Sequence, residues 1–275
     1  HRDLHSFPTR RSSDLGNVKE KNLLRLEKYF KKRNLNYKML NYLDYSFEDI
    51  DVLTERDYLV LAGGDGTINH FLSEEKRDKI KAKILLYKAG SGNDFAREHK
   101  GFLVDITEEL KKAPYYLIND NKHYFINGVG MGIDAAVCDA VNLHKDGSYF
   151  KTAVNIFKTF KPYTLKIIVD GKEYIYNDVF FFVAMNGKYI GGGMKIAPEA
   201  KRNDDILEIY IIKAKSYKKI IPLFPLIYLG LHKIARSNVV HLRGKDIEVS
   251  LSEKQMMQAD GEVVHDLSNI EIHAN

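Results

Sequence analysis

Three glycines surround one carboxylate in the string Gly63-Gly64-Asp65-Gly66-Thr67. An apolar run precedes the string, as it does where a buried strand ends in a turn, and a helical pattern begins at its threonine. Glycine lets the backbone turn tightly and approach a ligand closely, and the free N–H groups at a helix N-terminus attract anions. The string therefore predicts a phosphate-binding turn, in which Asp65 would organise a metal ion or a network of hydrogen-bond donors.

A second small-residue turn, Gly90-Ser91-Gly92-Asn93-Asp94, follows the next predicted strand. Its glycines permit close approach, its hydroxyl and amide can form hydrogen bonds, and a helix begins behind it. Either turn by itself is explained as an ordinary connection between a strand and a helix. Two such turns in successive strand–helix units favour the binding of a nucleotide phosphate.

Two carboxylates flank a glycine near the C-terminus, in Asp260-Gly261-Glu262. In metal-assisted phosphoryl transfer, one carboxylate can hold or orient Mg²⁺ while the other accepts a proton from an attacking hydroxyl. The same three residues are also typical of a simple hairpin turn. Their interpretation as a catalytic pair therefore depends on the two phosphate-binding turns.

Two further segments allow more than one interpretation. In the polar loop 198–207, acidic side chains beside free carbonyl groups could hold a hard cation, although a solvated turn is the simpler explanation. The glycine-rich segment 127–134 is similar to a dinucleotide fingerprint but does not follow the first strand of a βαβ unit, and close packing of a strand against a helix explains its glycines equally well. Its Asp134 could bind a polar substrate group, and capping of the following helix is the simpler explanation.

The order of the predicted elements divides the chain into two domains. Strands alternate with helices up to residue 112, which predicts a parallel sheet whose site lies at the carboxyl ends of its strands. From residue 113 onward the strands follow one another closely, which predicts a mainly antiparallel β domain. Strands are expected at 37–42, 57–62 and 83–87, and then at 123–127, 163–169, 173–176, 179–185, 207–212, 246–251 and 270–273. Helices are expected at 18–33, 133–143, 149–160 and 217–233.

The overall composition excludes several classes of protein. The chain has 275 residues and a formal net charge of +5, and no basic tract is interleaved with stacking aromatic residues, which argues against a nucleic-acid partner. A single cysteine, Cys138, excludes an internal disulfide framework and favours a reducing compartment. No apolar segment is long enough to cross a bilayer, so we expect a soluble protein or one that sits on a membrane surface.

Two segments differ in character from the rest of the chain. Between Lys201 and Lys245 there are ten basic side chains and three acidic ones, around the proline-broken apolar stretch 220–234. This pattern fits docking on an anionic bilayer, and a solvated basic face over a buried helix fits it equally well. Residues 1–15 show neither a helical nor a strand period. We interpret them as a foreign or disordered extension and leave them out of the predicted fold.

Taken in order, the motifs resemble those of the diacylglycerol kinase catalytic domain family, which includes bacterial soluble lipid kinases and sphingosine kinases. The resemblance extends from about residue 16 to the end of the chain. It implies an α/β nucleotide-binding domain of the NAD kinase and diacylglycerol kinase type at 16–112, followed by a β-sandwich domain for the lipid substrate at 113–275. It rests on the segments 63–67, 90–97, 127–134, 161–163, 186–187, 191–194, 198–207 and 260–262.

The resemblance also implies roles for individual residues. ATP would lie in the crevice between the domains, and Asp65 would organise its phosphates and Mg²⁺. The residues that hold ATP would be Gly63, Gly64, Asp65, Gly66, Thr67, Ser91, Gly92, Asn93 and Asp94. Glu262 would take the proton of the lipid hydroxyl, and Asp260 would assist it or bind the catalytic Mg²⁺. A structural Mg²⁺ would be bound by the side chain of Asp204 and the carbonyl groups of Lys201 and Ile206.

The chain departs from the family pattern at its start. The family opens with an apolar strand and an Asn-Pro…Gly phosphate loop, and residues 1–15 stand in their place. We therefore expect the first domain to lack its usual first strand. His70, Ser91 and Asp205 replace the Glu, Thr and Gly that are usual in the family, and Ser91 keeps the hydroxyl.

The expected activity is transfer of the γ-phosphoryl group of ATP to a lipid hydroxyl, with diacylglycerol as the acceptor and phosphatidic acid as the product, at the cytoplasmic face of the inner membrane. One alternative is NAD kinase, which shares the fold and the Gly-Gly-Asp-Gly-Thr string. The turn at 90–97 and the pair Asp260 and Glu262 favour the lipid kinases. The other alternative is a non-catalytic protein that binds a nucleotide or a lipid. A second copy of the chain, in a homodimer, is a further partner that we consider.

Overall fold

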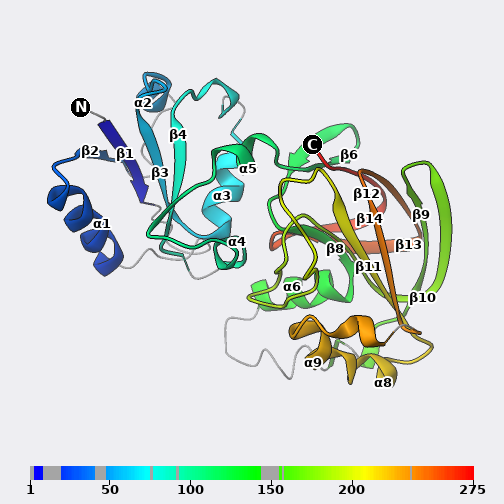
Figure 1. Cartoon of the computed structure of the whole chain (residues 1–275). Helices are drawn as coiled ribbons and strands as arrows, with labels where there is room; N and C mark the ends of the chain where they lie inside the picture. The colour runs from blue at the N-terminus through cyan, green and yellow to red at the C-terminus, as the bar shows by residue number, and fades with distance from the viewer. Residues whose placement is uncertain are drawn as a thin grey trace. The chain divides into compact units, whose positions relative to one another are not determined.

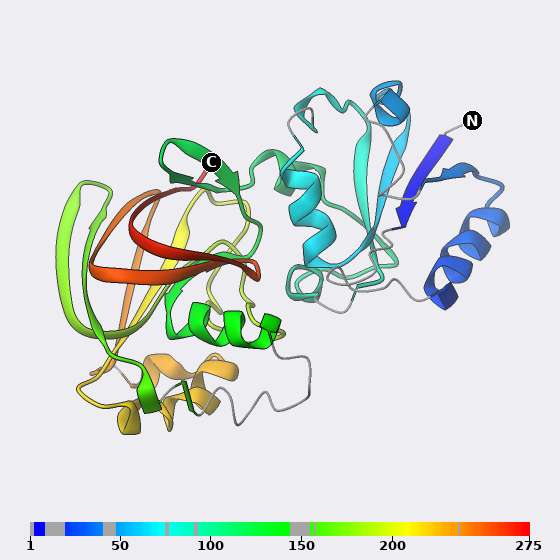
Figure 2. The same ribbon diagram turned by 180° about the vertical axis from the view of Figure 1, so that it is seen from behind.

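The computed structural model describes residues 3–8, 20–40, 48–74, 77–90, 93–143, 155–156, 158–235 and 237–275. Within it the chain forms two compact units, His1–Lys112 and Ala113–Asn275 (Figures 1 and 2). The first unit contains strands that alternate with helices, and the second is built mainly from antiparallel strands. The two kinds of domain expected from the sequence are therefore confirmed.

The first unit contains a five-stranded sheet with the strand order β2-β1-β3-β4-β5. Its first four strands are parallel, and β5 at the edge runs antiparallel to β4. The strands are β1 (Asp3–Pro8), β2 (Asn36–Met39), β3 (Tyr58–Gly63), β4 (Lys83–Lys88) and β5 (Leu103–Asp105). The helices are α1 (Glu20–Lys32), α2 (Glu48–Asp51), α3 (Asp65–Leu72), η1 (Arg77–Lys79), α4 (Asp94–Arg97) and α5 (Thr107–Lys111).

Helix α1 packs its apolar stripe against the central strands of this sheet. Leu26 and Phe30, four residues apart and therefore on one face of the helix, are fully buried in a cluster with Val60 of β3 and Tyr87 of β4. The run Leu59–Ala62 is buried along its whole length, as expected for a parallel strand that is covered on both faces. The backbone ladder between β3 and β4 sets their carboxyl ends side by side, and α1 packs over it.

The structure differs from the sequence-based expectation at the N-terminus, because β1 lies inside the segment 1–15 that we left out of the fold. The backbone of β1 pairs in parallel with β2 on one side and with β3 on the other. It thus fills the central position that the resemblance to the family left empty. A six-residue strand is too short to show a clear period, and its hydrogen-bond partners come from segments far along the chain.

The second unit contains a nine-stranded antiparallel arrangement, with the order β12-β11-β10-β8-β13-β14-β6-β7 and with β9 paired to both β10 and β13. Its first strands are β6 (Tyr115–Ile118), β7 (Asn121–Tyr124), β8 (Gly128–Gly132) and β9 (Tyr163–Val169). The others are β10 (Lys172–Met185), β11 (Leu207–Lys213), β12 (Val239–Gly244), β13 (Asp246–Ala259) and β14 (Glu262–His273).

Two long strands close this sheet on itself. One half of β10 pairs with β9 and the other half with β8, and β13 divides its partners in the same way. The side chains between the layers form an apolar core that includes Met131, Ile167, Phe182, Ile209 and Val249. Closure therefore places the short strand β8 and the loop before it next to the C-terminal end of β13.

Helices cover the opposite face of β10 and β11. They are α6 (Ile133–Leu143), α8 (Tyr217–Ile220), α9 (Leu223–Tyr228) and the short 3₁₀ helix η2 (His232–Ile234). Because both faces of β10 are covered, its segment Val179–Met185 is apolar at every position and fully buried. The single helix expected at 217–233 is broken near Pro222, and most of the helix expected at 149–160 lies outside the described residues.

The remaining differences concern short strands. The strand expected at 123–127 is replaced by β7 and β8, which leave residues 125–127 in a loop. The strands expected at 173–176 and 179–185 are one strand, β10, with an irregularity between Tyr176 and Val179. None of the helices in the described part of the chain has the length and the apolar character needed to span a membrane.

Candidate functional site

The two glycine-rich turns lie against each other in the first unit. Strands β3 and β4 are neighbours, and the N–H group of Ala89 donates to the carbonyl oxygen of Gly63 at 2.9 Å. A Cβ atom added to Gly90 would lie 2.5 Å from the backbone nitrogen of Gly64, so no larger residue fits there without moving the backbone. The two turns thus pack backbone against backbone at the carboxyl edge of the sheet.

Asp65 ties the first turn to the second. Its Oδ2 accepts the backbone N–H of Asp94 at 2.8 Å and its Oδ1 accepts that of Phe95 at 3.1 Å. The side chain is only 9% exposed. Because both oxygens are engaged by backbone donors, Asp65 fixes the position of the second turn, which fits the expected organisation of a donor network.

The other predicted phosphate-binding residues of this unit lie at the same edge. Thr67 is buried in the first turn of α3, and its backbone N–H donates to Gly64. The side-chain amide of Asn93 donates to the carbonyl oxygen of Gly90 at 2.6 Å, and the carboxylate of Asp94 pairs with Arg97. Ser91 and Gly92 lie outside the described residues. The structure therefore brings Gly63, Gly64, Asp65, Gly66, Thr67, Asn93 and Asp94 together.

The acidic pair of the second unit lies in a two-residue hairpin between β13 and β14. Ala259 pairs with Glu262, while Asp260 and Gly261 adopt positive φ angles of 48° and 98°. Two consecutive positive φ angles define the turn type that matches the twist of a hairpin and that Asp-Gly favours. Asp-Gly-Glu therefore forms the hairpin turn that its sequence predicts as the simpler interpretation.

The carboxylate of Asp260 is held by the loop that precedes β8. Its Oδ2 accepts the N–H of Ile126 at 2.6 Å, and its Oδ1 accepts those of Asn127 at 2.8 Å and Gly128 at 3.1 Å. Three backbone donors in a row surround one negative charge. Asp260 therefore anchors the hairpin to the end of β8.

Glu262 differs from Asp260 in its surroundings. Its side chain is exposed, and it has no hydrogen bond or ion pair with the other described residues. Nearby Tyr116 is buried, and burial together with the charges of Asp260 and Glu262 raises the pKa of its phenol to about 12. Of the two carboxylates, Glu262 is the one whose oxygens remain accessible to a substrate.

A second support of the hairpin was not predicted from the sequence. The N–H of Gly261 donates to the side-chain oxygen of Gln258 at 2.9 Å, and the amide nitrogen of Gln258 donates to Asp134 Oδ2 at 2.6 Å. Burial raises the pKa of Asp134 to about 6, although the hydrogen bond from Gln258 opposes the shift. Gly130 leaves the space for this contact, since a Cβ there would lie 2.4 Å from the carboxylate oxygen. The sequence marks Asp134 as a helix cap or a contact to substrate, but a single glutamine such as Gln258 carries no sequence signal for this hydrogen bond.

The polar loop 198–206 is joined to the same region by a buried arginine. Arg202 donates to the carbonyl oxygen of Ile126 at 2.5 Å and to the side-chain oxygen of Asn127 at 2.8 Å. Asn186 also donates to Ile126, at 3.1 Å. The loop before β8 is thus held by Asp260, Asn186 and Arg202, and its own Asn127 is buried together with Asn186 and Arg202.

The loop that is predicted to bind a structural Mg²⁺ offers oxygen atoms as ligands. The Oδ1 atom of Asp204 is buried and has no hydrogen-bond partner within the described part of the chain, while Oδ2 lies 3.6 Å from Arg243. A buried carboxylate oxygen of this kind fits a hard cation, and the carbonyl groups of Lys201 and Ile206 belong to the same loop. The described residues contain no cluster of three or more His, Cys, Asp or Glu side chains that could hold a metal ion.

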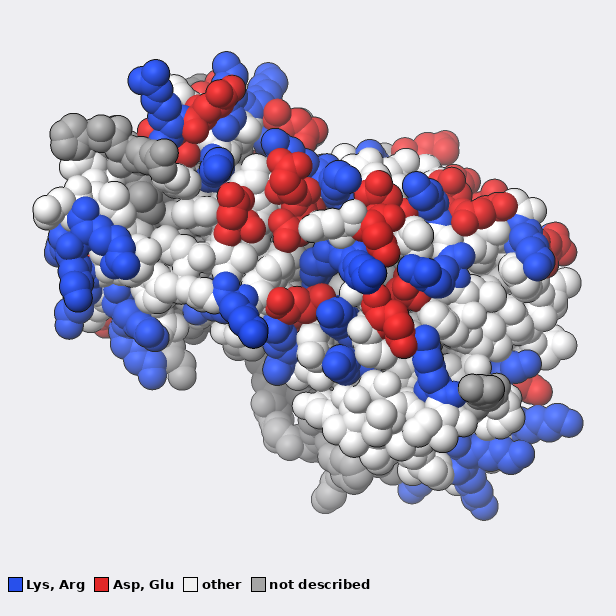
Figure 3. Space-filling view, in the orientation of Figure 1, with Lys and Arg blue, Asp and Glu red and all other residues white. Residues whose placement is uncertain are grey.

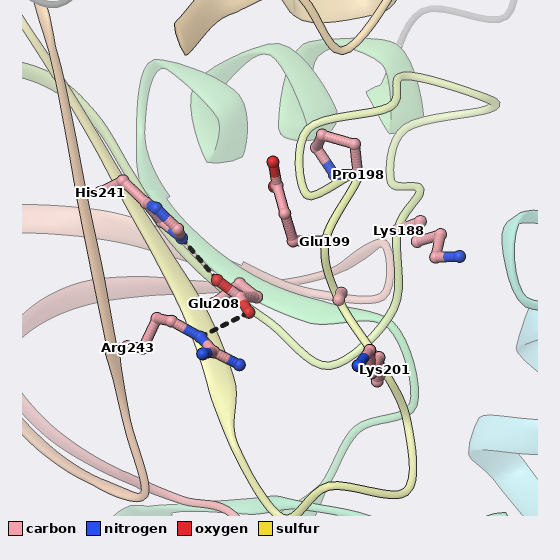
Figure 4. A pocket seen from close by; sticks show the side chains of 8 residues that line it. Lys188, Pro198, Glu199, Lys201, Glu208, His241 and Arg243 are labelled. Atoms are coloured by element: carbon pink, nitrogen blue, oxygen red, sulfur yellow. Dashed lines mark hydrogen bonds and ion pairs between the residues drawn. The ribbon is translucent and has the colours of Figure 1, made fainter.

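A cavity of about 460 Å³ lies beside this loop (Figure 4). Glu208, which is 1% exposed, accepts hydrogen bonds from His241 at 2.5 Å and from Arg243 at 2.8 Å. The carboxylate of Glu199 accepts from Tyr210 and pairs with Lys233, and these contacts outweigh its burial and lower its pKa to about 2. Lys188 and Lys201 also line the cavity, so its lining carries three basic side chains, with Arg243, against the two carboxylates.

Two family models cover most of the chain. The model described as "Diacylglycerol kinase catalytic domain" matches residues 16–119. The model described as "YegS C-terminal NAD kinase beta sandwich-like domain" matches residues 127–272, which is more than half of the chain. The boundary between the two matches lies just before β8.

Curated relatives agree with these matches. A diacylglycerol kinase of Bacillus subtilis (strain 168) is 27% identical over 225 residues, which are 76% of this chain and 72% of that protein. A diacylglycerol kinase of Mycobacterium tuberculosis (strain ATCC 25618 / H37Rv) is 27% identical over 214 residues, which are 70% of this chain and 69% of that protein.

A solved structure supports the fold. The crystal structure of a diacylglycerol kinase from Bacillus anthracis str. Sterne superposes with a TM-score of 0.61 at 18% sequence identity, over 99% of this chain and 93% of that chain. At this identity the likeness shows a shared fold. The two family models show that the chain belongs to the diacylglycerol kinase catalytic domain family.

Proposed function

We propose that the protein is an ATP-dependent lipid kinase that transfers the terminal phosphoryl group to the free hydroxyl of diacylglycerol and releases phosphatidic acid and ADP. The observation that carries the proposal is the Asp260–Glu262 hairpin, in which one carboxylate is fixed by three backbone donors and the other is exposed. Relatives that are named diacylglycerol kinases support the class of reaction.

In the proposed reaction, the Glu262 carboxylate accepts the proton of the lipid hydroxyl as its oxygen forms a bond to the γ-phosphorus. The bond from that phosphorus to the bridging oxygen breaks, and the electron pair leaves with ADP. Phosphoryl transfer depends mainly on positioning and on charge stabilisation, so a base with accessible oxygens and a rigid support is sufficient on the acceptor side. Asp260 and Gln258 supply that rigidity through the hairpin.

On the donor side, we propose that the paired glycine turns hold the phosphates of ATP. Glycine-rich turns let a backbone approach a phosphate closely, and helix α3, whose N-terminal end favours anions, begins directly after β3 at this edge of the sheet. Asp65 would act by fixing the second turn. Bound Mg²⁺ would neutralise charge on the phosphates, and Asp204 with the carbonyl groups of Lys201 and Ile206 would hold a structural Mg²⁺.

The proposal is tested with labelled ATP and a panel of acceptors, namely diacylglycerol, sphingosine, phosphatidylglycerol and NAD, separated by thin-layer chromatography. We expect phosphatidic acid as the labelled product. Labelled NADP would instead establish the NAD kinase alternative, and binding of ATP without any labelled product would establish the non-catalytic one. Because a membrane lipid is the acceptor and ATP the donor, we propose the cytoplasmic face of the membrane as the place of reaction.

The Glu262→Gln variant tests the proposed base. Glutamine keeps the size of the side chain but cannot take a proton, so we expect turnover to fall by roughly 10²–10⁴-fold, as is usual when general-base catalysis is lost. Turnover equal to that of the unmodified chain would refute the assignment of Glu262.

A further inference from the structure

The segment 215–235, which contains α8, α9 and η2 and is called the cover layer below, has two apolar sides. On its inner side Ile220, Leu223 and Ile227 are buried against the outer face of β10 and β11. Its outer side also carries large apolar side chains. A helical layer that only covered a sheet would need one apolar side, so the second one calls for an explanation.

The outer apolar side chains are concentrated in this layer. Eight large apolar side chains of the described residues are exposed, and five of them lie between Ile221 and Ile234. Their exposed fractions are 42% for Ile221, 56% for Tyr228, 62% for Leu229, 47% for Leu231 and 74% for Ile234. Single exposed apolar residues are ordinary, whereas a group within one short segment marks a contact surface.

The charge of the cover layer has one sign. No aspartate or glutamate occurs between Glu208 and Asp246 in the sequence. Lys215, Lys218 and Lys219 are exposed at one end of the layer. Figure 3 shows a broad uncharged surface over the region of α8 and α9, with basic side chains along its lower margin.

We propose that the cover layer is the surface by which the protein docks onto an anionic lipid bilayer. The exposed apolar side chains would enter the boundary between headgroups and acyl chains, and the lysines would lie against the lipid phosphates. This inference deepens the proposed function and rests on it for its biological sense, because a kinase whose acceptor stays in the membrane has to reach that membrane.

Charge argues for a bilayer over a second copy of the chain. In a symmetric dimer the same patch meets itself, so the lysines of one copy would face a layer that has no acidic residue to balance them. An anionic membrane offers the complementary charge over the whole surface, together with an apolar interior for the side chains from Ile221 to Ile234.

The test measures sedimentation of the full chain with vesicles. The vesicles contain either phosphatidylcholine alone or equal parts of phosphatidylcholine and phosphatidylglycerol. We expect binding to the anionic vesicles only. Leu229→Glu should weaken it by about tenfold or more because a charge replaces a membrane-inserted side chain. Ile175→Glu is the matched control, since Ile175 is 60% exposed, lies on β10 outside the layer, and should bind as the unmodified chain does.

A second pair of variants tests the charge. Replacement of Lys215, Lys218 and Lys219 together by glutamine should weaken binding to anionic vesicles by roughly a hundredfold, since each lysine near such a surface adds about fivefold. The control replaces three exposed lysines outside the layer, Lys172, Lys245 and Lys254, and changes the net charge by the same amount. Equal losses in both triple variants would overturn the proposal, because net charge alone would then explain binding.

Failure of this inference can be told apart from failure of the proposed function. The layer variants should keep full activity toward a short-chain, water-soluble diacylglycerol and lose activity only on vesicles. If the unmodified chain binds anionic vesicles through the layer but phosphorylates no lipid, the docking surface stands and the kinase function falls. The docking surface is refuted if Leu229→Glu binds vesicles normally. It is also refuted if the unmodified chain sediments as a dimer without vesicles and Leu229→Glu sediments as a monomer.

Discussion

Replacement of Asp260 by asparagine separates support from catalysis in the hairpin. The substitution keeps the size of the side chain and the backbone geometry, because asparagine tolerates the positive φ of 48° that this position adopts. The substitution changes the hydrogen-bond acceptors of the side chain. One carboxylate oxygen becomes an NH₂ group, and the negative charge is lost.

The magnitude follows from the three bonds at 2.6, 2.8 and 3.1 Å. The amide oxygen of the new side chain can keep the two donors on Oδ1, Asn127 and Gly128, as weaker neutral bonds. The amide NH₂ then faces the N–H of Ile126, so that donor loses its acceptor. With about 1.5–3 kcal/mol for one charge-assisted bond and smaller losses for the other two, we expect local destabilisation of about 2–4 kcal/mol.

Hydrogen exchange measured by mass spectrometry is the suitable assay, because the chain has two units and global unfolding need not be two-state. Amides 126–128 should exchange roughly 30- to 700-fold faster in Asp260→Asn, since about 1.4 kcal/mol corresponds to a factor of ten. Glu262→Gln should leave their exchange unchanged, because that side chain is exposed and bonds to none of the described residues. The reasoning is refuted if Asp260→Asn exchanges normally yet loses activity, since Asp260 would then act on the substrate or metal directly.

Two other carboxylates give distinct predictions. Asp65→Asn removes an acceptor from one of the N–H groups of Asp94 and Phe95, so we expect a lower melting temperature and about tenfold weaker ATP binding by calorimetry; unchanged affinity would contradict the role of this bridge. The pKa of Asp134 is raised to about 6 in the folded chain. Between about pH 4 and pH 6 the folded chain therefore holds a proton that the unfolded chain has lost. The contribution of Asp134 to stability is present below about pH 4 and disappears as the pH rises through 6. Asp134→Asn should therefore match the unmodified chain in urea unfolding near pH 4 and exceed it by about 1–3 kcal/mol at pH 8, and parallel pH profiles for the two proteins would exclude this coupling.

Much of the first unit could be predicted because its signals are local. The buried run before Gly63 and the strand before Gly90 each end in a turn that only small residues can form, and both strands were placed within one or two residues. Placing the turns side by side needed only the rule that parallel neighbours end at the same edge. The partners of Asp65 could not be predicted, because the contact joins backbone groups 29 and 30 residues away.

What the sequence could not supply was long-range pairing. Strand β1 depends on backbone partners in β2 and β3. The sequence of β8 leaves a glycine fingerprint and close packing of a strand against a helix as alternatives, because Gly128, Gly130 and Gly132 conceal its strand pattern. The structure gives these glycines steric reasons. A Cβ at Gly128 would lie 2.4 Å from the sulfur of Met185, and one at Gly130 would meet Asp134 at the same distance. Close packing explains them without a dinucleotide.

A hairpin elsewhere in the second unit shows which part of the acidic motif indicates chemistry. Asp170 and Gly171 connect β9 to β10 with positive φ angles of 49° and 78°, and Asp170 Oδ1 accepts the N–H groups of Lys245 and Asp246, each at 2.9 Å. The anchoring carboxylate of Asp260 therefore repeats a structural device, and an Asp-Gly turn that holds a neighbouring loop is no sign of a catalytic site.

The two hairpins differ at the next residue. Lys172 follows the first turn, whereas Glu262 follows the second, and both side chains are exposed. If the turn itself were the functional element, both hairpins would qualify. Because only the second of these two hairpins presents a carboxylate base, the proposed function rests on Glu262. Glu262→Gln should lower turnover by roughly 10²–10⁴-fold, whereas Lys172→Gln should leave it unchanged.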